Sequence, residues 1–86
     1  MFTIFTQENC PNCTVLKDFL KQRNIEYNEL DVNNNFEARA KMIFNDIETT
    51  PAILYNGNMF GGELEVLKSR IMELNKWLSK LYGLVW

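Results

Sequence analysis

Two cysteines separated by two residues carry the clearest chemistry in this sequence. Cys10 and Cys13 enclose Pro11 and Asn12, and the 86-residue chain has 2 cysteines in all. One turn of helix brings two thiols at this spacing close together, so the pair can alternate between a dithiol and a disulfide. The motif therefore predicts thiol–disulfide exchange.

The two cysteines are expected to have different roles. Cys10 falls where a strand gives way to a helix, and a helix N-terminus favours an anion, which lowers the pKa of a thiol below its usual value of about 8.5. Cys10 is therefore the predicted nucleophile. Cys13, inside the first turn, is predicted to attack the resulting mixed disulfide and release the reduced substrate. The chain has no histidine base, so Lys17 is the side chain expected to assist the helix end.

Two other interpretations of the cysteine pair stay open. The thiols could be core residues that happen to lie three positions apart, or they could form half of a metal site. A structural zinc site needs four nitrogen or sulfur ligands, and 2 cysteines with no histidine cannot supply them from one chain. No bound metal is predicted.

Length and charge narrow the class of protein. Eighty-six residues predict a single domain, 1–86, and 47% hydrophobic residues are enough for a core. A net charge of −2 lacks the basic excess that nucleic-acid binding requires. The chain shows neither a signal-peptide pattern nor a run long enough to cross a membrane. We expect a cytoplasmic monomer that binds neither nucleic acid nor membrane.

The apolar pattern predicts the order β-α-β-α-β-β-α, hence an α/β fold whose mixed four-stranded sheet has helices on both faces. Two strands joined through a helix form a right-handed parallel crossover. Asn56-Gly57 predicts a tight hairpin, because both residues of such a turn need positive φ. The predicted strands are Phe2–Thr6, which should be buried on both faces, a segment within Ile25–Val32, Ala52–Tyr55 and Asn58–Phe60.

Three helices are predicted from apolar residues at helical spacing. The first begins at Pro11, whose missing N–H costs nothing at the first helical position. The second begins with a capping-box variant formed by Asn34 and Glu37, and the third follows Gly61-Gly62 and ends near Gly83. The predicted buried stripes are Val15, Leu16, Phe19 and Leu20; Phe36, Ala40, Ile43, Phe44 and Ile47; and Leu64, Leu67, Ile71, Leu74, Leu78 and Leu81.

Two further motifs have both a structural and a functional interpretation. Pro51, after Thr50, stands at the start of a strand, where a residue without an N–H is tolerated, and a cis bond there would mark a constrained site. Gly61-Gly62 separates a strand from a helix, and its backbone N–H groups could bind a carboxylate. Either motif can equally be an ordinary turn.

Together these motifs resemble those of the glutaredoxins, a small branch of the thioredoxin fold. The resemblance rests on Cys10-Pro11-Asn12-Cys13, Thr49-Thr50-Pro51 and Gly61-Gly62, which occur in this order over nearly the whole chain. It implies a thioredoxin fold and a thiol–disulfide oxidoreductase that reduces protein or glutathione mixed disulfides. It also implies glutathione as redox co-substrate and no tightly bound cofactor.

The resemblance also implies roles for particular residues. The catalytic pair would be Cys10 and Cys13, and Pro51 would be cis and lie beside their disulfide, with Pro11, Asn12 and Lys17 supporting the site. The residues implied for binding glutathione or substrate are Gln7, Thr49, Thr50, Gly61, Gly62 and Glu63.

Three positions depart from the family's pattern. Gln7 stands where a basic residue is common, and Leu64 where a small polar or acidic side chain often caps the last helix. Glu63 adds a negative charge beside the expected place of a glutathione carboxylate, which should weaken binding.

Two alternatives accompany the glutaredoxin interpretation. Glutaredoxin-like hydrogen donors, for example for ribonucleotide reductase, look much the same but are reduced by thioredoxin reductase. They tend to carry a Ser-Gly-Phe turn where this chain has Gly61-Gly62. A glutathione-bridged iron–sulfur carrier is the other alternative. Such carriers mostly lack the second cysteine, so Cys13 argues against it.

The last ten residues are unusually apolar for a tail. They include Trp77, Tyr82, Leu84, Val85 and Trp86. We expect them to close one face of the core, with a partner-docking patch as the alternative.

Overall fold

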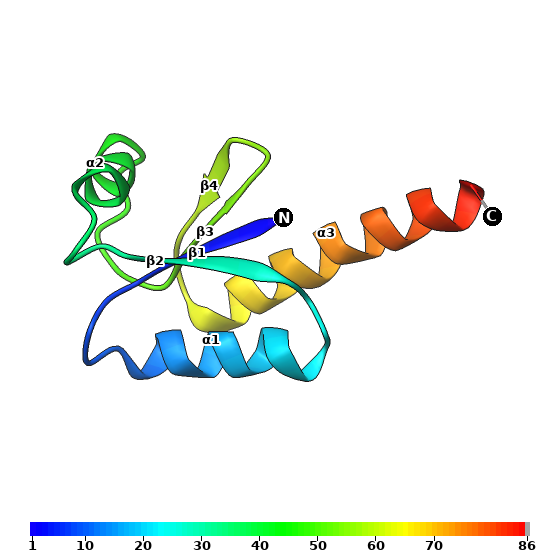
Figure 1. Cartoon of the computed structure of the whole chain (residues 1–86), viewed down its shortest axis with the longest axis horizontal. Coiled ribbons are helices and arrows are strands. Elements are labelled where there is room, and N and C mark those ends of the chain that lie inside the picture. The colour runs from blue at the N-terminus through cyan, green and yellow to red at the C-terminus, as the bar shows by residue number, and fades with distance from the viewer. Residues whose placement is uncertain (86) are drawn as a thin grey trace.

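A computed structural model describes the backbone of residues 1–85 and the side chains of residues 1–76. The element order is the predicted one (Figure 1). The elements are β1 (Phe2–Thr6), α1 (Pro11–Gln22), β2 (Tyr27–Asp31), α2 (Phe36–Phe44), β3 (Ala52–Tyr55), β4 (Asn58–Phe60) and α3 (Leu64–Val85).

The four strands form one mixed sheet in the order β2-β1-β3-β4. β1 runs parallel to β2 and antiparallel to β3, and β3 pairs with β4 in an antiparallel hairpin. Asn56 and Gly57 connect the hairpin with φ values of 49° and 79°, which confirms the predicted turn. The predicted thioredoxin-type topology is therefore present.

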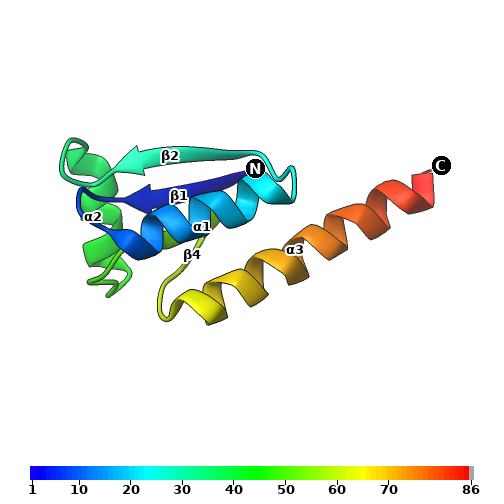
Figure 2. The ribbon, with the colours of Figure 1, turned by 90° about the horizontal axis from the view of Figure 1, so that it is seen from below.

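Helices cover both faces of this sheet (Figures 1 and 2). α1 and α3 lie together on one face, and α2 lies on the other. Each face has its own apolar core, and the two central strands, β1 and β3, contribute to both. The first core comprises Phe2, Ile4, Leu16, Leu20, Ile25, Ile53, Leu67 and Ile71; the second comprises Phe5, Val32, Ala38, Met42 and Ala52.

The prediction for α2 was wrong in its first residues and in its buried face. Its N-cap is Asn35, whose side-chain oxygen accepts a hydrogen bond from the backbone N–H of Ala38 at 3.0 Å, whereas Asn34 bonds to Asp31. Ala38 and Met42, four residues apart on one side of the helix, are the residues that face the sheet. Most of the predicted stripe is exposed instead: Phe36 by 86%, Phe44 by 86% and Ile43 by 66%.

Two smaller predictions were also wrong. Val15 is 43% exposed, because α1 turns Leu16 and Leu20 toward the sheet. α3 continues to Val85 rather than ending near Gly83. The predictions for Leu78, Leu81 and the apolar tail from Trp77 to Trp86 lie outside the described side chains. Within the described part of the chain, no helix is long and apolar enough to span a membrane.

Candidate active site

Cys10 and Cys13 are joined by a disulfide at the junction between β1 and α1. Asn9 adopts a left-handed conformation with φ 57°, which asparagine tolerates, and turns the chain into the helix. Cys10 is then the N-cap of α1 and Pro11 its first residue, as predicted. Cys13 is only 2% exposed, whereas Cys10 is partly exposed. The sulfur that an incoming substrate can reach is therefore that of Cys10.

Two hydrogen-bond donors point at the sulfur of Cys10. The backbone N–H of Cys13 donates to Cys10 Sγ at 3.1 Å, and the hydroxyl of Thr50 donates to the same sulfur at 3.5 Å. Donors of this kind favour the charged form of a thiol, and the helix end adds its partial positive charge. The surroundings of Cys10 thus suit a thiolate once the disulfide is reduced.

Thr50 reaches Cys10 because of the sheet topology. The Thr50–Pro51 peptide bond is cis, as the family resemblance implies, and directly precedes β3. β3 lies beside β1 in the sheet, so the start of β3 meets the end of β1 that leads to the cysteines. The carbonyl oxygen of Thr50 lies 3.6 Å from Cys10 Sγ, which places a reduced thiol at a distance to donate to it.

Two shallow cavities meet at Cys10 and share Gln7, Asn9 and Pro11. The first has a volume of about 400 Å³, and its other lining residues are Thr6, Cys13, Thr14, Lys17 and Glu29. The second has a volume of about 350 Å³, and its other lining residues are Asn12, Glu48, Thr49 and Thr50. The structure therefore gathers most of the predicted site residues around the disulfide.

Lys17 lines the first cavity, but its ammonium group bonds to Glu29 on β2. The distance from Lys17 Nζ to Glu29 Oε2 is 3.1 Å, and the Thr6 hydroxyl donates to the same oxygen at 2.8 Å. The hydrogen bond from Thr6 lowers the pKa of Glu29 below its ordinary value, and the hydrogen bond and charge of Lys17 add to this against partial desolvation. Glu29 is therefore a carboxylate at neutral pH. Sequence reasoning missed Glu29, although its place on a strand parallel to β1 puts it near the cysteine loop.

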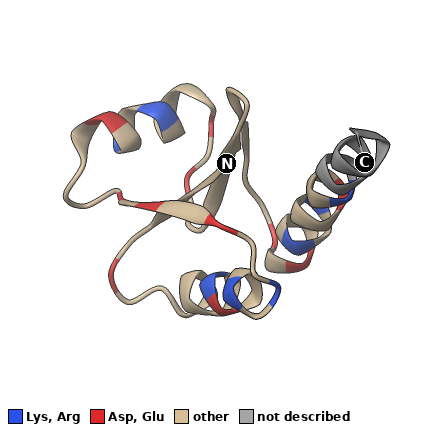
Figure 3. Cartoon of the chain, turned by 45° about the vertical axis from the view of Figure 1, so that its right-hand side comes forward, with Lys and Arg blue, Asp and Glu red and all other residues tan. Residues whose placement is uncertain are grey.

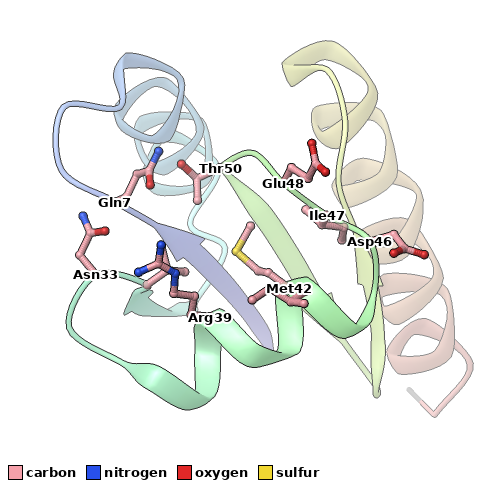
Figure 4. Close-up of a pocket in the computed structure, with 10 residues that line it drawn as sticks. Gln7, Asn33, Arg39, Met42, Asp46, Ile47, Glu48 and Thr50 are labelled. Carbon is pink, nitrogen blue, oxygen red and sulfur yellow. The ribbon is translucent and has the colours of Figure 1, made fainter.

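A third cavity of about 380 Å³ lies next to Thr50 on the α2 side of the molecule (Figure 4). Gln7, Asn33 and the guanidinium of Arg39 lie toward one end of it, and Asp46 and Glu48 toward the other. Gln7 stands where the family commonly has a basic residue and brings no positive charge to this cavity. Arg39 supplies one instead. Sequence reasoning missed Arg39, because a lone arginine on a short helix gives no pattern.

Gly61, Gly62 and Glu63 do not line these three cavities. Gly61 packs so closely on Ile47 that a Cβ there would lie 2.8 Å from Ile47 Cγ2. Gly62 has φ 125°, a conformation that side chains disfavour, and the carbonyl of Glu63 accepts the first-turn hydrogen bond from Leu67. The described structure thus gives this segment a packing and turn role.

A CxxC pair at a helix N-terminus, beside a cis-proline loop in this sheet topology, defines a thioredoxin-fold thiol–disulfide oxidoreductase. The sequence model of the family described as Glutaredoxin matches residues 2–60. The chain belongs to the glutaredoxin family.

Individual relatives agree with this assignment. Glutaredoxin 3 of Escherichia coli is 33% identical over 60 residues, which cover 69% of this chain and 72% of that protein. The glutaredoxin-like protein NrdH of Lactococcus lactis is 27% identical over 62 residues, covering 72% of this chain and 86% of the relative. The crystal structure of the thioredoxin-like protein BC3987 superposes with a TM-score of 0.70 at 32% identity, covering 80% of this chain and 97% of the other.

Proposed function

We propose that this protein reduces protein or glutathione mixed disulfides through its Cys10-Cys13 dithiol. The observation that supports this most is the difference between the two sulfurs. Cys10 is partly exposed and receives two hydrogen bonds, whereas Cys13 is buried behind it. This arrangement suits a first attack by Cys10 and a second attack by Cys13.

The proposed reaction has two exchange steps. The Cys10 thiolate attacks one sulfur of the substrate disulfide, the substrate S–S bond breaks, and the departing thiolate takes up a proton. Cys13 then loses its proton and attacks Cys10 Sγ, which breaks the mixed disulfide, releases the second substrate thiol and forms the Cys10–Cys13 disulfide. The substrate gains two electrons, and the structure shows the oxidised product of the dithiol.

We propose glutathione as the electron donor that restores the dithiol. Arg39 supports this choice, because its guanidinium lines a cavity next to Thr50 and can pair with a carboxylate such as the two that glutathione carries. Asp46 and Glu48 in the same cavity oppose an anion, so we expect weak binding. In this proposal Gln7, Thr49 and Thr50 contact the glutathionyl group, while Gly61, Gly62 and Glu63 form a more distant part of the same surface.

The alternative donor is thioredoxin reductase, which reduces the glutaredoxin-like hydrogen donors. The similarity of this chain to a glutaredoxin-like protein, NrdH, favours this alternative. Turnover of a small mixed disulfide with glutathione and glutathione reductase, run beside an assay with thioredoxin reductase, separates the two. We expect activity with glutathione and a raised KM for glutathione in Arg39→Met, with Lys41→Met as the matched loss of a cation on α2. If the protein is active with thioredoxin reductase but not with glutathione, the proposal of glutathione as the electron donor is wrong and thioredoxin reductase takes its place.

The remaining proposals follow from the proposed reaction. A dithiol reductant needs a reducing compartment, so we propose a cytoplasmic location. We also propose that residues 1–86 form a single monomeric domain. Ribonucleotide reductase is proposed as one client by analogy with the hydrogen-donor branch of the family.

A further inference from the structure

Glu29 is the one carboxylate among the residues that line the cavity containing both cysteines. It lies on β2, the strand parallel to β1, and the cavity's one cation, Lys17, lies on α1. Figure 3 shows acidic positions on β2 and basic positions on the neighbouring α1. The other residues lining this cavity are uncharged, so this pair supplies the charges on the side of the disulfide that this cavity covers.

Glu29 is held in place from two sides. The Thr6 hydroxyl donates to Glu29 Oε2 at 2.8 Å, and Thr6 is only 3% exposed at the end of the central strand. The same oxygen accepts from Lys17 Nζ at 3.1 Å. Because a buried strand residue fixes the carboxylate, the carboxylate in turn fixes the ammonium group.

When the bond to Glu29 is absent, the Lys17 ammonium group can lie closer to the cysteine sulfurs. Lys17 lies four residues after Cys13 on α1, so the two side chains lie on the same face of the helix. An ammonium group freed from Glu29 can turn toward the sulfurs, where a positive charge stabilises a thiolate. Glu29 opposes this effect by its own charge and by restraining Lys17.

We propose that Glu29 is a positioning residue that sets the reduction equilibrium of the Cys10–Cys13 pair by neutralising and restraining Lys17. This inference rests on the proposed dithiol function. With Glu29 in place the reduced form gains little from Lys17, so the disulfide stays comparatively stable and the dithiol is a stronger reductant. Other charged side chains on the surrounding elements are Glu8 in the loop before Cys10, Asp18 and Lys21 on α1, Asp31 on β2, and Glu48, which lines the second cavity at Cys10; of these, Lys21 acts on Glu29.

Opposite changes in two single variants test this role. In Glu29→Gln we expect the pKa of Cys10 to fall by about 0.5 to 1, and the exchange equilibrium with a reference dithiol to move about 3- to 10-fold toward the reduced protein. In Lys17→Met we expect both quantities to move the other way. The double variant Glu29→Gln/Lys17→Met should lie near the wild type, because it is neutral again.

The pKa is measured from thiolate absorbance against pH, and the equilibrium by incubation with dithiothreitol in its reduced and oxidised forms. Glu26→Gln removes an exposed carboxylate that does not line the cavity, and it should shift neither quantity. Shifts of the same sign in Glu29→Gln and Lys17→Met, or shifts no larger than that of Glu26→Gln, would overturn the proposal. If Glu29→Gln does not fold, an unchanged Cys10 pKa in Lys17→Met overturns it alone.

These measurements distinguish a failure of the proposed role of Glu29 from a failure of the proposed dithiol function. Both measurements use a small dithiol and require neither glutathione nor a client protein. A wild-type disulfide that fails to exchange with dithiothreitol would count against the function itself. Normal exchange without opposite shifts in the two variants would count against the role of Glu29 only.

Discussion

The hydroxyl of Thr50 donates to the sulfur of Cys10 at 3.5 Å, although the two residues lie 40 positions apart in the chain. The contact depends on the antiparallel pairing of β1 and β3, which sets the start of β3 beside the loop that leads to Cys10. Thr50 therefore contributes a side-chain donor to the surroundings of Cys10 Sγ, beyond the binding of glutathione or substrate that the family resemblance implies for it.

Replacing Thr50 by valine removes this hydroxyl while keeping a similar shape. We expect the pKa of Cys10 to rise by about 0.5 to 1, and alkylation of Cys10 below that pKa to slow by about 3- to 10-fold. Thr50→Ser keeps the donor and should restore the wild-type rate. A Thr50→Val variant that reacts as fast as the wild type would show that the backbone N–H of Cys13 and the helix end suffice.

The two cysteines should respond differently to substitution by serine. Cys10→Ser is expected to abolish disulfide reduction, because the buried Cys13 is only 2% exposed and cannot meet the substrate first. Cys13→Ser should leave a stable mixed disulfide between Cys10 and the substrate, visible by mass spectrometry. Preferential alkylation of Cys13 in the reduced wild type at pH 7 would contradict this assignment of roles.

The Cys10–Cys13 pair could be predicted from sequence because the approach of its two sulfurs depends on local spacing. Cys10 and Pro11 lie at the start of one helix, where the N-cap and the first position have clear residue preferences. Glu29 and Arg39 reach the site through the packing of distant elements, and the spacing of residues along the chain does not specify such contacts. The parallel β1–β2 pair and the β3–β4 hairpin were predictable for a related reason, since the βαβ rule and the Asn-Gly turn each specify one pairing.

The buried face of α2 was mispredicted because the segment contains more apolar residues than the helix can bury. Phe36, Ile43 and Phe44 share a helical spacing with one another, yet Ala38 and Met42 contact the sheet. Both stripes have helical spacing, so the periodicity does not select between them; packing against the sheet buries the stripe of Ala38 and Met42.

Substituting Asn35 tests its role as the N-cap of α2. Asn35→Ala should lower the free energy of unfolding by about 1 kcal/mol, because the N–H of Ala38 loses its side-chain acceptor. Asn34→Ala removes an exposed hydrogen bond to Asp31 and should cost less. Urea unfolding of the two variants compares them directly, and a larger cost for Asn34→Ala would favour Asn34 as the N-cap.

Gly61 is expected to tolerate no side chain while Ile47 is present. A Cβ at Gly61 would lie 2.8 Å from Ile47 Cγ2 and 3.1 Å from Cγ1, so Gly61→Ala should cost about 1–3 kcal/mol of stability. In an Ile47→Ala background the same change should cost much less, because the three atoms nearest to the added Cβ are gone. Gly62→Ala is the control: its cost comes from φ 125° with open space around it, so Ile47→Ala should not relieve it.

The depressed pKa of Glu29 predicts a pH-dependent contribution to stability. The carboxylate accepts from Thr6 and Lys17 in the folded state, so the unfolded chain, with the ordinary value near 4.5, takes up protons first as the pH falls. The stabilisation by Glu29 is therefore complete above the unfolded pKa and is lost as the pH falls through the lower folded pKa.

We expect the wild type to be more stable than Glu29→Gln at pH 7 by less than about 1 kcal/mol, because the side chain of Glu29 is 40% exposed and the pair is screened by solvent. Urea midpoints of the two proteins should converge between about pH 5 and pH 3, whereas Glu26→Gln should show no such convergence. A stability difference between wild type and Glu29→Gln that stays constant over this range would contradict the linkage.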